Sequence, residues 1–214
     1  MTRPTANCPN CGARLEFLWS GAVQTTCGYC RSILVRRDLD LEKVGTVADY
    51  PPDSSPIQIG TEGMDRGTPF LVVGRIIYEY ERGAWNEWHL VMNDGSSAWL
   101  SDAQLEYALS RLTTPPGPLP AAAELRPGRA FVWGDERYAV TTITRARYRG
   151  VEGELPFEYW DKSEVPFADL ATSDGGFATI DYSEPEPLLF TGRWVTWDQL
   201  ALRNVRQFEG WPLP

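Results

Sequence analysis

The sequence predicts a mainly β protein that begins with a zinc ribbon, and three observations support this fold class. Nineteen glycines and seventeen prolines in 214 residues indicate many short strands and turns rather than long helices. Hydrophobic residues make up 43% of the chain and aromatic residues 12%, which is too apolar for a disordered protein. Two CxxC pairs lie near the N-terminus. We expect the ribbon to be followed by two small barrel-like (SH3-like) antiparallel β-units.

The four cysteines have the spacing of a four-cysteine zinc site. Two residues between thiolates let both sulfurs of a pair reach one ion from a tight turn. Between the pairs, alternating apolar residues on both sides of a Ser-Gly turn predict a hairpin that returns the second pair to the first. We therefore expect residues 1–37 to form the ribbon. Its expected ligands are Cys8, Cys11, Cys27 and Cys30.

Disulfides and a catalytic metal site are the alternative interpretations of these cysteines. The N-terminal residues lack the apolar stretch of a secretory signal, which favours a cytoplasmic location with reduced thiols. Four thiolates also complete a tetrahedral site and leave no position for water or substrate. Gly12 and Gly28 lie where the two turns need a permissive backbone. We expect one structural zinc ion, which would stabilise a segment too short to fold alone.

Composition and periodicity then predict a linker and a first β-unit. Residues 38–56 begin acidic and continue with prolines and serines, which is typical of a linker. Residues 57–112 contain extended apolar patterns on both sides of an Asp94-Gly95 turn, a strong hairpin signal. Leucines spaced along residues 103–112, after a Ser-Asp cap, predict a short helix at the end of this unit.

The remaining residues predict a spacer and a second β-unit. Residues 113–122 are rich in proline and should form a semi-rigid spacer. Residues 123–214 return to β-branched and aromatic patterns and form the second unit. The residues that follow Trp194 echo those that follow Trp99, and a pseudo-duplication of the first unit would explain this echo.

The formal net charge is −9, and it is unevenly distributed. Residues 1–37 carry five arginines and a single acidic residue, Glu16, so a basic ribbon precedes an acidic body. An acidic body repels nucleic acid, and any nucleic-acid binding would have to use the ribbon. The longest apolar runs, such as residues 70–73, are far shorter than the roughly 20 residues of a membrane helix. We expect no transmembrane segment.

One strand carries the residues that most resemble a catalytic or binding set. Trp85, Glu87 and His89 alternate and therefore share one face of the predicted strand. His89 is the only histidine and Glu87 could orient it as a general base. No nucleophile pattern accompanies them, and a lone histidine in a strand is more often structural. We expect no catalytic site and consider this face a candidate surface for a partner.

Three arginines also alternate along a predicted strand. Arg145, Arg147 and Arg149 would point in one direction and could bind phosphate or an acidic partner. The alternative, which we favour in so acidic a body, is pairing with carboxylates of the following segment. Those carboxylates are Glu152, Glu154, Glu158 and Asp161.

Several short runs together resemble a known family. They are Ile59-Gly60-Thr61, Phe70 to Gly74, Trp85-x-Glu87-Trp88, Asp94-Gly95, Trp99-Leu100 and Thr191 to Trp194. The chain resembles the bacterial domain-of-unknown-function family 4178 over about residues 57–200. The resemblance implies non-catalytic β-modules that often follow a zinc ribbon. It also implies genes beside phage-shock-type membrane-remodelling proteins, small membrane proteins and polyamine-synthesis-like enzymes. It supplies no active site.

Together these features predict a cytoplasmic, non-enzymatic protein-interaction or adaptor module with structural zinc. The resemblance links it to membrane-stress or polyamine-associated systems. Two alternatives stay open, namely a nucleic-acid-binding protein that uses the basic ribbon and an accessory subunit of an enzyme. A protein is the expected partner, and no small-molecule substrate is indicated.

Overall fold

A computed structural model describes residues 3–37, 40–47, 55–158 and 163–207. The described residues contain fifteen β-strands, a four-residue α-helix and one 3-10 turn. This confirms the mainly β prediction. None of the helices in these ranges is long and apolar enough to cross a membrane.

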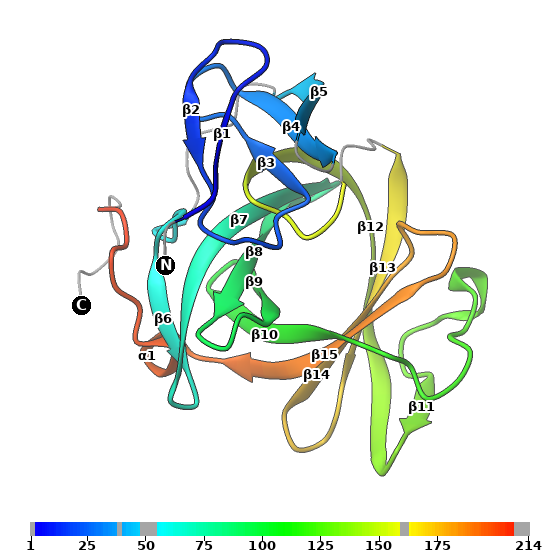
Figure 1. The fold of residues 1–214 in the computed structure, drawn as a ribbon. Helices are drawn as coiled ribbons and strands as arrows, with labels where there is room; N and C mark the ends of the chain where they lie inside the picture. Colours follow the sequence, from blue (N-terminus) through cyan, green and yellow to red (C-terminus); the bar gives the residue numbers. More distant parts are fainter. Residues whose placement is uncertain (1–2, 38–39, 48–54, 159–162, 208–214) are drawn as a thin grey trace.

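Two small antiparallel sheets form the N-terminal ribbon, at the top of Figure 1. The third strand of the second sheet, β5, lies in the stretch predicted as a linker, because its residues pair in register with β4. Residues 48–54 of that linker lie outside the described ranges. The ribbon strands are β1 (Thr5–Asn7), β2 (Arg14–Glu16), β3 (Gln24–Thr26), β4 (Ser32–Arg37) and β5 (Asp40–Thr46).

Eight strands of the main sheet close into a barrel. Around the ring their order is β7, β8, β9, β10, β15, β14, β13 and β12, and β12 pairs again with β7. Figure 1 shows these strands arranged around a central space. Two further strands, β6 (Glu62–Asp65) and β11 (Ala130–Trp133), extend the hairpins of β7 and β12 outside the ring. The ring strands are β7 (Thr68–Tyr80), β8 (Gly83–Met92), β9 (Ser97–Ala103), β10 (Glu106–Thr113), β12 (Glu136–Gly153), β13 (Glu164–Ala171), β14 (Gly176–Asp181) and β15 (Leu188–Val195).

The two predicted β-units share this one closed sheet rather than forming separate barrels. Tyr107 of the first unit pairs with Val195 of the second, and Tyr78 pairs with Tyr148. The physical reason is the length of β12, which spans 18 residues and has a register shift near Tyr148. A strand this long can pair with β11 and β13 along one part and with β7 along another.

The predicted helix over residues 103–112 is wrong, because most of this segment is β10. Gln104 and Leu105 both have positive φ, 51° and 73°, and form the two-residue turn of a β9–β10 hairpin. Leu109 is buried in the core on one face of β10, and Ala108 lies on the opposite face. The leucine spacing that resembled a helical face therefore belongs to a strand and its turn.

Loops and terminal segments cover the outer faces of the barrel. Ile57, Leu200 and Leu202 pack in one core with Trp88 and Leu90. The short helix α1 (Trp197–Leu200) is held by a capping box between Thr196 and Gln199. A second core places residues of β11 and of the proline-rich segment against strands β12 to β15. These segments therefore cover large parts of the outer face of the barrel.

The ribbon is attached to one end of the barrel by directed contacts. The carboxylate of Glu154 accepts the backbone N–H of Leu18 at 2.6 Å and that of Trp19 at 2.8 Å. Leu155 forms a β-bridge with Gln24 of the ribbon. Glu154 is 3% exposed, so its two hydrogen bonds lie away from solvent. A single carboxylate thus holds two successive peptide groups of the ribbon against the barrel.

Replacing Glu154 with Gln should loosen this attachment. The amide keeps one acceptor oxygen, so one of two buried N–H groups loses its partner, at a cost of about 1–3 kcal/mol in the free energy of unfolding. Amide hydrogen exchange should become faster at Leu18 and Trp19. The control is Glu164→Gln, which removes an exposed pair with Arg145. Unchanged exchange at the two ribbon amides in Glu154→Gln would contradict this role.

Candidate functional site

The four cysteines converge on one point of the ribbon. Their sulfurs all lie within 4.8 Å of one another, with Cys8 to Cys30 at 3.7 Å and Cys11 to Cys27 at 3.8 Å. A tetrahedral site with metal–sulfur bonds of about 2.3 Å requires sulfurs about 3.8 Å apart. The donor set therefore fits a four-coordinate metal ion that prefers thiolates. The four cysteines could bind such an ion as the sequence predicted.

The backbone of both cysteine turns prepares this arrangement. Gly12 has a φ of 76° and follows the first pair, and Arg31 has a φ of 58° in the matching place after the second. The prediction that Gly28 supplies a permissive conformation is wrong, because the left-handed residue of the second turn is Arg31. In each turn this residue donates its N–H to the carbonyl of the first cysteine. The hydroxyl and backbone N–H of Ser32 also lower the pKa of Cys30 to about 5, which favours a thiolate.

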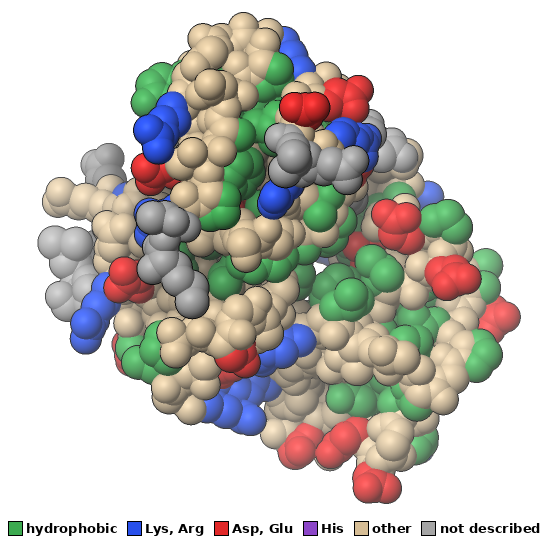
Figure 2. Space-filling view, in the orientation of Figure 1, with side chains coloured by type: hydrophobic (Ala, Val, Ile, Leu, Met, Phe, Trp, Pro, Cys, Tyr) green, Lys and Arg blue, Asp and Glu red, His purple; other side chains and the backbone are tan. Residues whose placement is uncertain are grey.

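A second site lies inside the barrel, where a cavity of about 600 Å³ reaches solvent at exposed residues of two hairpin turns. Figure 2 shows the molecule hollowed near its centre, with hydrophobic side chains around the hollow. Small side chains on β10, Ala108 and Ser110, leave the space that larger residues would fill. Arg82, Gln104 and Glu106 mark the exposed turns.

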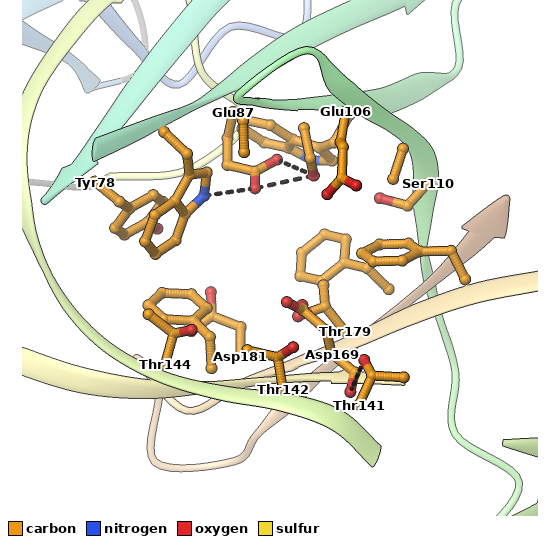
Figure 3. A pocket seen from close by; sticks show the side chains of 18 of the residues that line it. Tyr78, Glu87, Glu106, Ser110, Thr141, Thr142, Thr144, Asp169, Thr179 and Asp181 are labelled. Carbon is orange, nitrogen blue, oxygen red and sulfur yellow. Dashed lines mark hydrogen bonds between the residues drawn. The ribbon is translucent and has the colours of Figure 1, made fainter. Parts of the chain in front are cut away.

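Four carboxylates line this cavity, Glu106 at its exposed edge and three more on opposite walls. Glu87 projects from β8, and Asp169 and Asp181 project from β13 and β14 across the space, as Figure 3 shows. Glu87 accepts hydrogen bonds from Trp85 Nε1–H at 2.9 Å and from the Ser101 hydroxyl at 2.8 Å. The side chain of Glu87 borders the cavity and is otherwise enclosed by neighbouring protein groups. The inner wall is therefore acidic.

Burial raises the pKa of the three carboxyls on opposite walls. The pKa of Glu87 rises to about 8, because burial disfavours its charge and because Asp169 and Asp181 repel it. Burial likewise raises the pKa of Asp169 to about 6 and that of Asp181 to about 6. Near neutral pH these groups can therefore exchange protons in response to a bound charge.

Aromatic rings form the other part of the lining. Tyr78 stacks on Trp85 with centroids 5.0 Å apart, and Phe167 meets both rings edge-on, at 4.8 Å and 5.6 Å. Tyr78, Trp99 and Phe167 also belong to the core that packs under the ribbon. The ribbon end of the cavity is therefore built from the same rings that support the ribbon.

His89 lies near this cluster and does not line the cavity. It is fully buried, and its ring touches Trp19 of the ribbon and Trp99 of the barrel, each with centroids 5.1 Å apart. Nδ1 is 2.9 Å from the carbonyl of Glu154, so this nitrogen must carry the proton, and Nε2 accepts from the Ser97 hydroxyl at 2.7 Å. Burial lowers its pKa to about 4. The ring is neutral and held in place, as a structural residue would be.

The face predicted as a candidate partner surface is thus directed inward. Trp85 and Glu87 line the cavity, and His89 is enclosed between ribbon and barrel. The alternating arginines lie on the outside and are paired. Arg145 contacts Glu164 at 2.8 Å, and Arg147 and Arg149 share Glu79. Pairing agrees with the interpretation that we favoured, but the partners are Glu79 and Glu164 rather than Glu152, Glu154 or Glu158. The fourth carboxylate that we named, Asp161, lies outside the described residues.

The sequence reasoning missed Asp169 and Asp181 as site residues. Asp169 alternates with Phe167 and Ala171, and Asp181 alternates with Phe177 and Thr179, so each acid shares a face with residues that would be expected to be buried. An acid on the apolar face of a strand was the available signal. It could not show that the two acids would lie opposite Glu87.

The comparisons with known proteins concern the barrel. The sequence model of a family described as a domain of unknown function, DUF4178, matches residues 58–196. The chain belongs to this family. The matched residues include all eight ring strands and exclude the cysteine ribbon, so the DUF4178 domain of this chain is the closed barrel. Searches of curated proteins and of solved structures found no match.

The buried Glu87 predicts a pH dependence of stability. A carboxyl whose pKa is raised in the folded state binds its proton more tightly than the unfolded chain does, so its contribution is present below pH 4.5 and is lost as pH rises through about 8. Glu87→Gln should reduce this loss. Because one pKa unit corresponds to about 1.4 kcal/mol, the gain at pH 8.5 relative to pH 5.5 should be on the order of 1–4 kcal/mol.

Urea denaturation of the metal-loaded protein at the two pH values measures this gain. Asp169 and Asp181 will still contribute a slope in the variant, so the slope should fall without disappearing. The control is Glu106→Gln, at the exposed edge of the cavity. An equal slope in wild type and Glu87→Gln would show that Glu87 does not hold its proton in the folded state.

Proposed function

We propose that this protein is a non-enzymatic binding protein whose barrel takes up a small organic ligand. The observation that carries the proposal is the cavity of about 600 Å³ inside a closed sheet, lined by aromatic rings and four carboxylates, of which Glu106 lies at the exposed edge. Ligand sites in proteins commonly have volumes of about 300–1,000 Å³, with apolar walls and a few convergent polar groups. This revises our expectation from the sequence, which indicated no small molecule.

Binding accounts for the lining better than catalysis does. Among the described residues that line the cavity there is no histidine, cysteine or lysine, and no hydroxyl there is paired with an imidazole base. His89, the candidate base, is turned toward Glu154 and Ser97 instead. The charged and polar groups that remain are carboxylates, hydroxyls, one amide and the guanidinium of Arg82 at the exposed turn, which suit recognition of a ligand.

The proposal assigns a structural zinc ion to the ribbon. Four thiolates with near-tetrahedral spacing would hold it, and it would supply folding free energy rather than chemistry. Because the ribbon packs on the barrel through Trp19 and Glu154, the ion would also support one end of the cavity.

The protein-interaction role predicted from the sequence stays a prediction without comparable support. The residues predicted to contact a partner include Trp85, Glu87 and His89, and these three do not lie on an outer surface. The alternative of nucleic-acid binding relies on the positive charge of the ribbon. Part of this charge is neutralised, because Arg37 pairs with Glu42 and Glu158. The links to membrane-stress and polyamine-associated systems and to an enzyme partner, like the cytoplasmic location, also stay predictions.

A variant that fills the cavity tests the binding function. Ala108 lines the cavity, so Ala108→Phe should occupy it and abolish binding of fragments that wild type takes up. Saturation-transfer NMR with a panel of neutral, cationic and anionic fragments measures uptake. Val132→Phe, at an exposed position of β11, adds the same ring away from the cavity and should bind as wild type does. Equal binding by Ala108→Phe and wild type would overturn the proposal.

The zinc assignment predicts one zinc ion per chain by elemental analysis. Cys27→Ser should lose the ion and destabilise the ribbon, since Cys27 is fully buried and the apparent binding free energy of such sites is about 10–16 kcal/mol. Ribbon amides should then exchange faster than those of β9 and β10. Protein purified without chelator that contains no zinc, or that contains disulfides between these cysteines, would contradict the assignment.

A further inference from the structure

Several carboxylates on the outer face of the barrel pair with arginines, whereas Glu87, Asp169 and Asp181 have no ion pair with a described residue. On the outer face Glu79 and Glu164 pair with arginines, and Glu152 pairs with the buried Arg75 at 3.1 Å. Inside, Glu87 is contacted by neutral donors, the indole N–H of Trp85 and the hydroxyl of Ser101. Asp181 accepts a backbone N–H from Ser183.

The described lining of the cavity offers no internal cation for these acids. Its single basic residue, Arg82, is exposed at the turn between β7 and β8. Burying an acid without a cation or full hydrogen bonding is costly, and three acids in one cavity also repel one another. A positively charged ligand would relieve both costs, whereas an anion would add to them.

The rings beside the acids indicate which kind of cation fits. Trp85 donates to Glu87, so the indole lies next to the carboxylate, and Tyr78 and Phe167 pack around it. The face of an aromatic ring attracts an organic cation and also packs against its carbon atoms. A hard metal ion instead needs six or more oxygen ligands converging on one point, and here the acids lie on opposite walls.

We infer that the barrel cavity binds an organic ammonium ion, held by Glu87, Asp169 and Asp181 with its carbon skeleton against Tyr78, Trp85 and Phe167. This inference rests on the proposed binding function and names the class of its ligand. The acids on opposite walls would let the charged group be contacted from either side of the space, as Figure 3 shows. The apolar rings would exclude strongly hydrated inorganic cations.

The titration of the acids makes this binding depend on pH. Between pH 5.5 and 8.5 the carboxyls of Asp169, Asp181 and Glu87 lose protons, while an alkylammonium with a pKa near 10 keeps its charge. Affinity should therefore rise with pH. The other titratable groups that line the cavity are Tyr78, Tyr80, Arg82 and Glu106, and the nearby His89 stays neutral in this range because its pKa is about 4.

Three probes with one carbon chain separate charge from shape. Hexylamine, hexanol and hexanoate are titrated calorimetrically into the full-length, metal-loaded protein at pH 8.5. The affinity of hexylamine should be at least about tenfold higher than that of hexanol, a difference of about 1.4 kcal/mol in binding free energy. Hexanoate should bind most weakly. The hexylamine affinity should fall at pH 5.5, and the hexanol affinity should not.

Variants assign the effect to the acids. Asp169→Asn combined with Asp181→Asn should weaken hexylamine about tenfold and leave hexanol unchanged, because the amides keep the shape of the acids without their charge. Glu164→Gln, an exposed carboxylate outside the cavity that pairs with Arg145, is the matched control and should change neither affinity by more than about twofold. Circular dichroism and thermal unfolding confirm that each variant is folded. If the double variant is unfolded, Glu87→Gln replaces it with the same expected result.

The outcomes distinguish this inference from the binding function on which it rests. If hexanol or hexanoate binds wild type as tightly as hexylamine does, the ammonium assignment is overturned. The cavity would still be one that binds ligands. Absence of hexylamine binding would overturn it as well, while the fragment panel with Ala108→Phe decides the binding function separately. Hexylamine binding that persists in Ala108→Phe would place the amine outside the barrel and would also overturn the inference.

Discussion

The structure depends on the pairing of β12 with β7, which closes the sheet. Without this pairing, the ring strands would form an open sheet with two edges and a solvated inner face. Closure requires β12 to leave β13 and continue along β7, and the register shift near Tyr148 permits the change of direction. Gly153, with a φ of 66°, ends the strand where a side chain would strike the backbone carbonyl of Val73. The cavity follows from this closure.

A closed ring of eight strands can fill its interior with side chains or enclose a ligand. In this barrel Ala108 and Ser110 are too small to meet the rings on the opposite wall, so space remains. Acids in such an interior lower stability, and proteins retain unneutralised groups of this kind mostly where they serve a function. The lack of a basic partner for Glu87, Asp169 and Asp181 among the described residues therefore says more about the role of the barrel than its fold does.

The ribbon contributes more than a separate metal site. Ile33 and Val47, from the N-terminal part of the chain, share a core with Val151 and Leu155 of the barrel. Glu154 lies between Val151 and Leu155 in the sequence. The carboxylate of Glu154 holds the ribbon, and its carbonyl fixes His89. The ribbon that carries the cysteine cluster and the packing of one end of the barrel are consequently joined through a few buried contacts.

The sequence by itself determined the features that depend on neighbouring residues. Two CxxC pairs predict the four cysteines that converge and could bind a metal ion, because the donor spacing is local, and the turn and apolar patterns predict a β protein. The alternation along β8 also placed Glu87 on one face with Trp85, and the family resemblance agrees with the match over residues 58–196.

Only the tertiary structure decided which face became the interior. Alternation divides a strand into two faces without showing which one a closed sheet encloses, so Trp85, Glu87 and His89 seemed suited to an outer surface. Asp169 and Asp181 gained meaning when β13 and β14 came to lie across the ring from β8. Pairings such as Tyr78 with Tyr148 join residues far apart in the chain. No local pattern encodes such contacts, because the free energy that selects them comes from closing the whole sheet.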